Sequence, residues 1–297
     1  MMLGLGNLSH SAYAQNDNIQ RQGLIQMANI FLEDTRTLVD PNSADHASAT
    51  VGSIVTNRKI LHNGRRSKMG GAATMVSPCY ALTARHVVFG DEQPTMVDRD
   101  YYHYNDFAVT LSIGNDAQGG PKWTIIADPV EFGADNVGGD DFALLHLRHC
   151  AGVDRTIGWM DWGKAEENLD VRMTGVQGDK VFGTMWNSHG QIVKSFIDHT
   201  FDHNLPTRHG SSGSPLYTTR LGLPPLLRAL NTGAKGDKAS ILPTYYAYLS
   251  NTAIDAEYLY QMVSGRIQDN IDWFNRTFPG RQNPQIELST SAGASVP

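Results

Sequence analysis

The sequence predicts an all-β fold, either a barrel or a sandwich, with a helix near each end of the chain. Short segments rich in β-branched and aromatic residues recur from about residue 51 to residue 247, separated by Gly, Pro, Asn and Asp. Many short strands at such spacing are typical of barrels and sandwiches. The chain has 297 residues, of which 40% are apolar and 18% charged, which suits one large globular domain or two small ones.

The first 48 residues are predicted to precede the β-region. Residues 1–14 end in Ala-Tyr-Ala, the form of a signal cleavage site, but they hold no Lys or Arg and only a short apolar run. We interpret them as a truncated signal segment or as no signal at all. Residues 15–48 are expected to be a helical extension, because apolar residues recur with helical spacing over residues 17–39 before Asp40-Pro41. It is either a structural extension packed on the main domain or a removable pro-segment.

Two series of short strands follow this extension. The segments of the first series are residues 51–56, 72–76, 80–88, 107–113, 123–126 and 142–147. The second series includes residues 181–186, 191–197, 215–218 and 226–230. Turn sequences such as Gly-Asn-Asp and Gly-Gly-Pro separate them.

A closing helix is predicted over residues 252–276. Thr252-x-x-Asp255 resembles a capping box at its start, and Pro279-Gly280 ends it. The apolar stripe of this helix consists of Leu259, Val263, Ile267, Ile271 and Phe274. Residues 281–297 are small and polar, so we expect a disordered tail.

Charge and apolar patterning argue against two classes of partner. The net charge is −6 and the 24 basic residues are scattered, so we expect no nucleic acid partner. No apolar run approaches the roughly 18 residues of a membrane-spanning helix, so we expect no membrane partner.

Three segments together suggest nucleophilic chemistry. Residues 210–215 read Gly-Ser-Ser-Gly-Ser-Pro, in which flanking glycines allow a sharp turn and two amide N–H groups can point at one spot. Alone, this segment could be an ordinary Gly/Ser loop. Residues 83–86 read Thr-Ala-Arg-His and residues 141–145 read Asp-Phe-Ala-Leu-Leu, which supply a base and an acid.

These three motifs, in the order His, Asp, Ser, resemble those of the chymotrypsin-like (trypsin-fold) serine peptidases. The serine motif looks most like that of the bacterial branch that includes glutamyl endopeptidases. The resemblance implies two six-stranded antiparallel β-barrels with the catalytic groups in the cleft between them. The first barrel would span residues 49–150, and the second, with the C-terminal helix, residues 151–280.

The resemblance also implies roles for individual residues. Ser212 would be the nucleophile, His86 its general base and Asp141 the group that orients the imidazole. The backbone N–H groups of Gly210 and Ser212 would form the oxyanion hole. Two neighbours compete for these roles, Asp140 and Ser211, but the motifs place the aspartate directly before Phe-Ala-Leu-Leu and the serine directly before Gly-Ser-Pro.

The expected activity is therefore that of a serine endopeptidase acting on protein or peptide substrates without a cofactor. We expect a secreted or periplasmic monomer, with the family resemblance as the main reason for export. Two alternatives remain open, a catalytically silent binding protein on the same fold and an esterase.

A histidine-rich stretch before the serine motif offers a metal-site alternative. His199, His203 and His209 lie near Asp198 and Asp202, and His-x-x-x-His can bind zinc on a helix. The proline at position 206 and the following glycine loop make a helix unexpected. We therefore interpret the stretch as a solvated loop or cleft wall and expect no metal site.

The sequence departs from the family at several positions. Ser211 replaces the acidic residue that pairs with a freed N-terminal amino group in trypsin-type enzymes, so we expect local hydrogen bonds, including one of the Ser211 hydroxyl, to hold the loop. Val87 and Gly71 stand where a disulfide usually flanks the histidine. Pro206 stands at the pocket-floor position, and Asn231 aligns with the histidine that grips glutamate, so no side-chain preference follows.

By the same loose alignment, the candidate substrate-binding residues are Pro206, Thr207, Asn231 and Gly233.

The family fold also suggests a partner for each of the two cysteines, which are not spaced as a Cys-x-x-Cys metal site. Cys79 begins the strand expected to carry His86, and Cys150 ends the strand that begins with Asp141. These strands are antiparallel neighbours in the family, so we expect a Cys79–Cys150 disulfide. The alternative is two buried free thiols.

Overall fold

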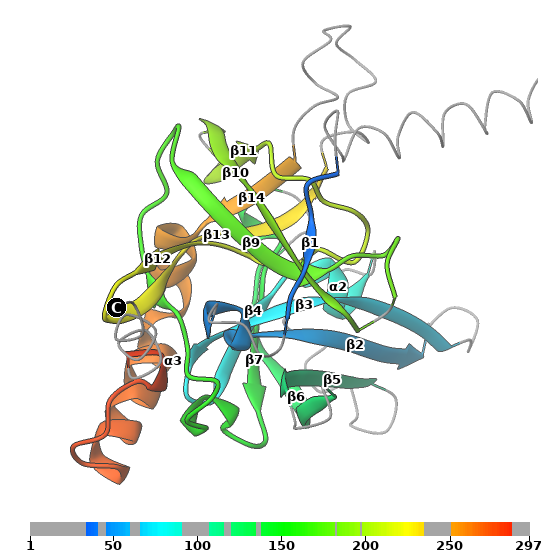
Figure 1. Cartoon of the computed structure of the whole chain (residues 1–297). Coiled ribbons are helices and arrows are strands. Elements are labelled where there is room, and N and C mark those ends of the chain that lie inside the picture. Colours follow the sequence, from blue (N-terminus) through cyan, green and yellow to red (C-terminus); the bar gives the residue numbers. More distant parts are fainter. Residues whose placement is uncertain are drawn as a thin grey trace, which may run out of the picture.

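Strand pairing closes the first half of the chain into a six-stranded antiparallel barrel, in the order β2-β3-β4-β7-β6-β5 and back to β2 (Figure 1, lower part). The computed structural model describes residues 34–40, 46–59, 66–90, 107–115, 120–134, 138–181, 183–196, 198–234 and 251–286. The strands of this barrel are β2 Val51–Lys59, β3 Arg66–Ser77, β4 Tyr80–Thr83, β5 Phe107–Asn115, β6 Pro121–Phe132 and β7 Ala143–Leu147. Alternate residues, among them Ile54, Val109, Leu111 and Leu145, fill its interior.

The second half closes into another six-stranded antiparallel ring, because β9 pairs with both β10 and β12 (Figure 1, upper part). Its strands are β9 Asp170–Val176, β10 Met185–Ser195, β11 Thr200–His203, β12 Pro215–Arg220, β13 Leu223–Ala234 and β14 Asn251–Asp255. Two short strands join it from outside, β1 Thr37–Leu38 beside β10 and β8 Asp161–Trp162 beside β13. The predicted two-barrel fold is therefore confirmed.

A single long helix, α3 Ala256–Thr277, follows the second barrel. The predicted apolar stripe is buried along it at Leu259, Val263, Ile267 and Phe274. The predicted capping box is wrong: Thr252 lies in strand β14, and Asp255 is the N-cap, whose carboxylate accepts from Glu257 N at 3.1 Å. Pairing of residues 251–255 with β13 and β11 delays the helix start.

The remaining helices are short. They are α2 Arg85–Phe89 and the 3₁₀ turns η1 His46–Thr50, η3 Gly138–Asp140 and η4 Ala151–Val153.

The N-terminal extension differs from the prediction where it is described. Residues 1–33, which include the signal-like segment and most of the predicted helix, lie outside the described residues. Thr37 and Leu38, predicted as helix, instead form strand β1, which pairs with Asn187 and Trp186 of β10. Pairing with a distant strand edge has overridden the helical apolar spacing here.

Residues 181–186 and 191–197, predicted as two separate strands, contribute to a single strand in the structure. Residues 185–195 form the continuous strand β10, which pairs with β9 from Met185↔Val176 to Gln191↔Asp170. Val181, predicted to begin a strand, is 76% exposed and lies in the preceding connection. Gly190, which falls between the two predicted segments, lies inside the strand, next to the side-chain oxygen of Asn204.

The C-terminal tail is partly ordered, contrary to the prediction. Asn283 and Gln285 are buried and hydrogen bond to the backbone of Trp159 and Ile157. These bonds tie residues 281–286 onto the body of the protein, although their polar composition favoured disorder. Residues 287–297 lie outside the described residues.

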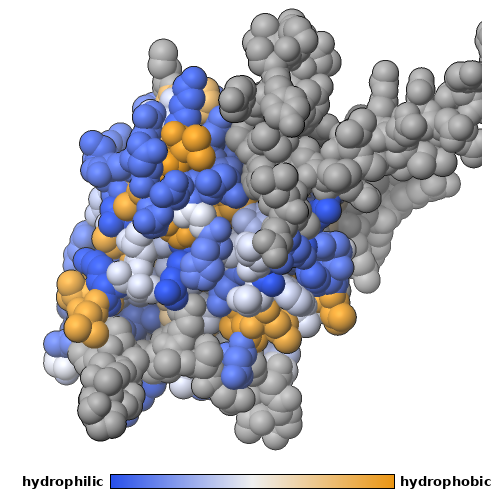
Figure 2. Space-filling model, turned by 45° about the horizontal axis from the view of Figure 1, so that its top comes forward, coloured by the Kyte–Doolittle hydropathy of each residue, from blue (hydrophilic) through white to orange (hydrophobic). Residues whose placement is uncertain are grey.

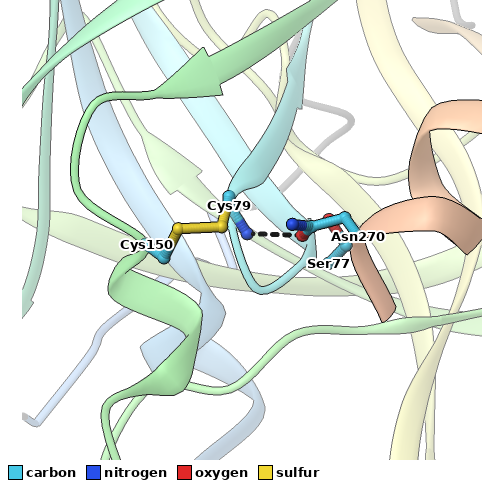
Figure 3. Close-up of a disulfide and its surroundings, with 4 residues drawn as sticks. All are labelled: Ser77, Cys79, Cys150 and Asn270. Carbon is cyan, nitrogen blue, oxygen red and sulfur yellow. Dashed lines mark hydrogen bonds between the residues drawn. A yellow bond between two sulfur atoms is a disulfide. The ribbon is translucent and has the colours of Figure 1, made fainter. Parts of the chain in front are cut away.

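The predicted disulfide is present between Cys79 and Cys150 (Figure 3). Strands β4 and β7 are antiparallel neighbours, and Leu147 N donates to Cys79 O at 2.9 Å, which brings the two cysteines together. Asn270 of α3 lies beside the bridge, where its side-chain oxygen accepts from Cys79 N at 2.9 Å and from Ser77 Oγ at 2.8 Å. The C-terminal helix is therefore fastened to the first barrel.

The surface is mainly hydrophilic, with apolar residues in separate patches on the face shown in Figure 2. Large apolar side chains that are well exposed include Val181 and Leu221, which belong to different connections. Among the described helices, none has the length and apolar character needed to cross a membrane.

Candidate active site

His86 is carried by helix α2, not by the strand predicted over residues 80–88. Strand β4 ends at Thr83, and Gly90, with a φ of 60°, caps the single helical turn by donating from its N–H to His86 O at 2.7 Å. Burial of Val87, Val88 and Phe89 in the first-barrel core anchors the turn. Because Arg85, Val87, Val88 and Phe89 are consecutive or nearly consecutive buried residues, period-two alternation could not reveal the helical turn. The His86 side chain remains 26% exposed.

Asp141 holds His86 with both carboxylate oxygens. Its side chain is 6% exposed, and its Oδ1 accepts from the backbone N of His86 at 3.0 Å. Its Oδ2 lies 2.8 Å from His86 Nδ1. A carboxylate only accepts, so Nδ1 carries the proton and Nε2 is left with a free lone pair. The competing Asp140 ends a 3₁₀ turn. Burial is the main cause that raises the pKa of Tyr258, and the negative charge of Asp140 adds to this shift.

Ser212 lies in a tight turn built on two glycines in left-handed conformations, Gly210 with φ 90° and Gly213 with φ 83°. Within the turn, Ser211 N donates to Arg208 O, and Ser214 N donates to Ser211 O, both at 3.0 Å. Within the described part of the chain, the N–H groups of Gly210 and Ser212 have no protein acceptor. Two unpaired donors two residues apart fit the arrangement that an oxyanion hole requires.

The seam between the barrels brings the serine turn to the histidine helix. Ala72 N, on strand β3, donates to Ser212 O at 2.8 Å. A Cβ on the neighbouring Gly71 would lie 2.8 Å from both Ser212 O and a methyl group of Val87, the residue after His86. Only a glycine at position 71 therefore lets the serine turn and α2 approach this closely.

The Ser212 hydroxyl points to the second barrel in this structure. Its Oγ donates to Thr232 O at 3.4 Å, and within the described residues it makes no hydrogen bond to His86. Such geometry is common in ligand-free catalytic sites, where hydrogen bonds tighten in the complex with substrate.

A buried chain of side chains supports the serine turn from behind. Asn231 Nδ2 donates to Ser211 O at 2.9 Å and to Ser211 Oγ at 3.1 Å, which are the local bonds expected at this position. Its Oδ1 lies 3.0 Å from His203 Nε2, so that nitrogen must carry the hydrogen and donate it. Burial, partly offset by the bond to Asn231, lowers the pKa of His203 to about 4.

Sequence patterns missed this arrangement, because His203 was interpreted as part of a solvated loop or cleft wall. It instead lies in strand β11 and is fully buried. The other two histidines of the stretch have different surroundings: His199 stacks on Tyr258, and His209 is exposed. In the described residues, no group of three His, Cys, Asp or Glu side chains is arranged to hold a metal ion.

Three of the four predicted substrate-binding residues are buried, and the fourth is half-buried. Pro206 and Thr207 are buried, and Asn231 is 1% exposed, with its amide bonded to protein on both sides. The Asn231 side chain therefore faces the interior and not an open site. Gly233 is half-buried, with no atom within 4 Å of a Cβ added there, so its predicted role in substrate binding stays a prediction.

No family model matches the sequence. A protein named "Extracellular metalloprotease" from Bacillus subtilis (strain 168) is 24% identical over 227 residues, covering 72% of this chain and 66% of the relative, just under two thirds of its length. A solved structure of a Glu endopeptidase covers 80% of this chain and 99% of its own, with 14% identity and a TM-score of 0.55.

The active form of the Rv3671c protease from M. tuberculosis also matches, with 16% identity and a TM-score of 0.48 over 77% of this chain and 87% of its own. At 14% identity, the likeness to the Glu endopeptidase structure concerns the fold alone, and that fold agrees with the two barrels described above. The chain therefore has the trypsin-like fold, which the Glu endopeptidase structure shares.

Proposed function

We propose that the chain is a serine endopeptidase, with Ser212 as nucleophile, His86 as general base and acid, and Asp141 as the orienting carboxylate. The observation that carries the proposal is the convergence of two elements at Gly71, where the Ser212 carbonyl and Val87 of the His86 helix meet. The two bonds of Asp141 to His86, one to its backbone N–H and one to Nδ1 of its imidazole, add support, because they leave Nε2 free to accept a proton.

The first half of the proposed reaction forms an acyl-enzyme. Ser212 Oγ turns from Thr232 O toward His86, gives its proton to Nε2 and attacks the substrate carbonyl carbon. The N–H groups of Gly210 and Ser212 stabilise the negative oxygen that develops. The C–N bond then breaks, and the amine leaves with the proton that His86 returns.

The second half releases the acid product. Water gives a proton to His86 Nε2 and attacks the acyl ester, and the proton returns to Ser212 Oγ as the ester bond breaks. Asp141 stays ionised throughout and stabilises the imidazolium. No cofactor takes part in these steps, and the protein is proposed to work as a monomer in an oxidising extracellular or periplasmic compartment, which suits the disulfide.

A fluorophosphonate probe tests the proposal directly. We expect the wild-type protein to be labelled at Ser212 and to hydrolyse casein, and Ser212→Ala to lose both. Ser211→Ala is the matched control, because it removes only the 3.1 Å bond to Asn231 and keeps the bond to the Ser211 carbonyl. It should keep most of the labelling, at a stability cost of about 1 kcal/mol.

The other outcomes distinguish the alternatives. A wild-type protein that is not labelled would be a binding protein on a peptidase fold. One that cleaves p-nitrophenyl esters but not casein would be an esterase. The name of the Bacillus subtilis relative makes a chelator control necessary: casein hydrolysis lost in EDTA but not after fluorophosphonate treatment would contradict the serine mechanism.

A further inference from the structure

A fully buried arginine lies behind the serine turn, on the segment that precedes the first barrel. The side chain of Arg36 is 0% exposed, and each of its five guanidinium hydrogens has an acceptor. Nε and Nη2 donate to Asp34 at 2.7 and 2.9 Å, and Nη1 and Nη2 donate to Asp179 at 2.9 and 2.6 Å. The fifth hydrogen goes from Nη1 to Gln177 Oε1 at 3.0 Å.

Gln177 connects Arg36 to the serine turn. Its Oε1 also accepts from the backbone N of Arg208 at 2.9 Å, so a single buried oxygen joins the arginine to the turn. The Arg208 carbonyl in turn accepts from Ser211 N at 3.0 Å. The next residue after Gln177, Gly178, donates from its N–H to the His209 carbonyl. Residues 177 and 178 thus hold the Arg208 N–H and the His209 carbonyl, and the latter belongs to the same peptide group as the Gly210 N–H.

Charge and strand pairing keep the arginine in place. Hydrogen bonds from Arg36 are the main cause that lowers the pKa of both Asp34 and Asp179, so both carboxylates are ionised at neutral pH. Strand β1 follows immediately and pairs with β10, and Val39 N donates to Met185 O at 2.9 Å. The segment therefore lies as an added strand beside the connection that contains Gln177 and Asp179.

We propose that Arg36 is a positioning residue for the serine turn, so that residues 34–39 are part of the active-site support. Arg36 holds Gln177 and Asp179, on either side of Gly178; Gln177 and Gly178 hold the Arg208 N–H and the His209 carbonyl, and these bonds aim the Gly210 N–H at the oxyanion. The inference rests on the proposed function. A guanidinium is always charged, so this support needs no newly cleaved terminus, unlike the freed amino group that orders the loop in trypsin-type enzymes.

Four variants test the chain of contacts. Arg36→Lys keeps the positive charge but loses the planar fork, and Gln177→Met keeps the side-chain length but loses the shared acceptor. Gln177→Glu restores an acceptor for Arg208 N and serves as the conservative rescue. Arg220→Lys is the matched control, since Arg220 also binds a carboxylate, that of Asp161 at 2.7 Å, but touches no residue of the turn.

Two readouts are measured on the full chain: kcat and KM with a p-nitrophenyl ester, together with its acylation burst, and amide hydrogen exchange of peptides covering residues 206–216. We expect Arg36→Lys and Gln177→Met to lower kcat by about tenfold or more with KM nearly unchanged, short of the roughly hundredfold loss of a whole oxyanion donor. The same two variants should speed exchange in residues 206–216. Gln177→Glu and Arg220→Lys should stay within about threefold of wild type.

Several results would overturn the proposal. If Arg36→Lys or Gln177→Met lowers the melting temperature while kcat and exchange in residues 206–216 stay at wild-type values, the role of Arg36 is only structural. If Arg36→Lys does not fold, Gln177→Met decides by the same criteria. A wild-type protein without an acylation burst refutes the proposed function instead, and hydrogen exchange alone then decides whether Arg36 orders the turn.

Discussion

Acidification is expected to destabilise the protein through His203, a residue outside the proposed triad. His203 is fully buried in β11, and its Nε2–H donates to Asn231 Oδ1, an oxygen that can only accept. Protonation would place a positive charge in the interior, with Nδ1 lacking a hydrogen-bond partner. Burial lowers the pKa of this histidine from 6.5 to about 4, with the Asn231 bond opposing the shift.

The magnitude follows from linkage. Because the folded pKa is below the unfolded value, the unfolded chain takes up the proton first, and stability falls as the pH drops below 6.5. With these two values the loss amounts to about 1.4 kcal/mol at pH 5.5 and about 3 kcal/mol at pH 4. Above pH 7 the histidine contributes nothing to the pH dependence.

The assay compares urea unfolding of two proteins between pH 7.5 and pH 4, both carrying Ser212→Ala to prevent self-digestion. One retains His203, and the other carries His203→Gln, which donates an N–H to Asn231 but does not titrate. The difference between their unfolding free energies should shift by about 3 kcal/mol over this range, because carboxylate effects are common to both. Parallel loss of stability in the two proteins would refute a buried neutral His203.

Four further predictions can be checked by standard assays. Replacing Cys79 and Cys150 by serine opens a loop with a sequence separation of 71 residues and should lower the unfolding free energy by about 4 kcal/mol in chemical denaturation. Gly71→Ala should slow acylation and cost about 1–3 kcal/mol, because its Cβ would lie 2.8 Å from the Ser212 carbonyl. Gly265→Ala on the open face of α3 should instead raise the unfolding free energy by about 0.5–1 kcal/mol. Thermal melts in which Gly71→Ala is the more stable of the two variants would contradict both predictions. A tag left on the N-terminus should not reduce active-site titration, since Ser211 is neutral; activity that requires a cut near residues 48–51 would argue against this.

The barrels could be predicted because the strands repeat short apolar segments and because three motifs in a fixed order resembled a known family. The disulfide followed from the same resemblance, since it joins neighbouring strands on either side of the His86 and Asp141 positions. Local patterns failed where distant partners decide the structure. Thr37 and Leu38 follow apolar residues with helical spacing in the sequence but form a strand because they pair with the edge of β10.

The support of the site was also beyond sequence reasoning. Arg36 and Gln177 are ordinary polar residues in their local contexts, and only the fold brings them to Arg208. His203 looked solvated because polar residues surround it in sequence, yet β11 is closed on both sides by β10 and β14. The residues proposed to carry the reaction could be identified from motifs, whereas the residues that hold them in place depend on contacts between distant segments.

The position of α3 has a consequence for the order in which the protein matures on the ribosome. Phe274 lies in the core of the first barrel, with its ring centroid 5.1 Å from that of Trp159, and Asn270 binds the turn at Cys79. Domains commonly fold N-terminal first during synthesis. Here the first barrel receives its last core residue only after the second has been synthesised. Completion of the first-barrel core is thereby tied to synthesis of α3, which follows both barrels in the chain.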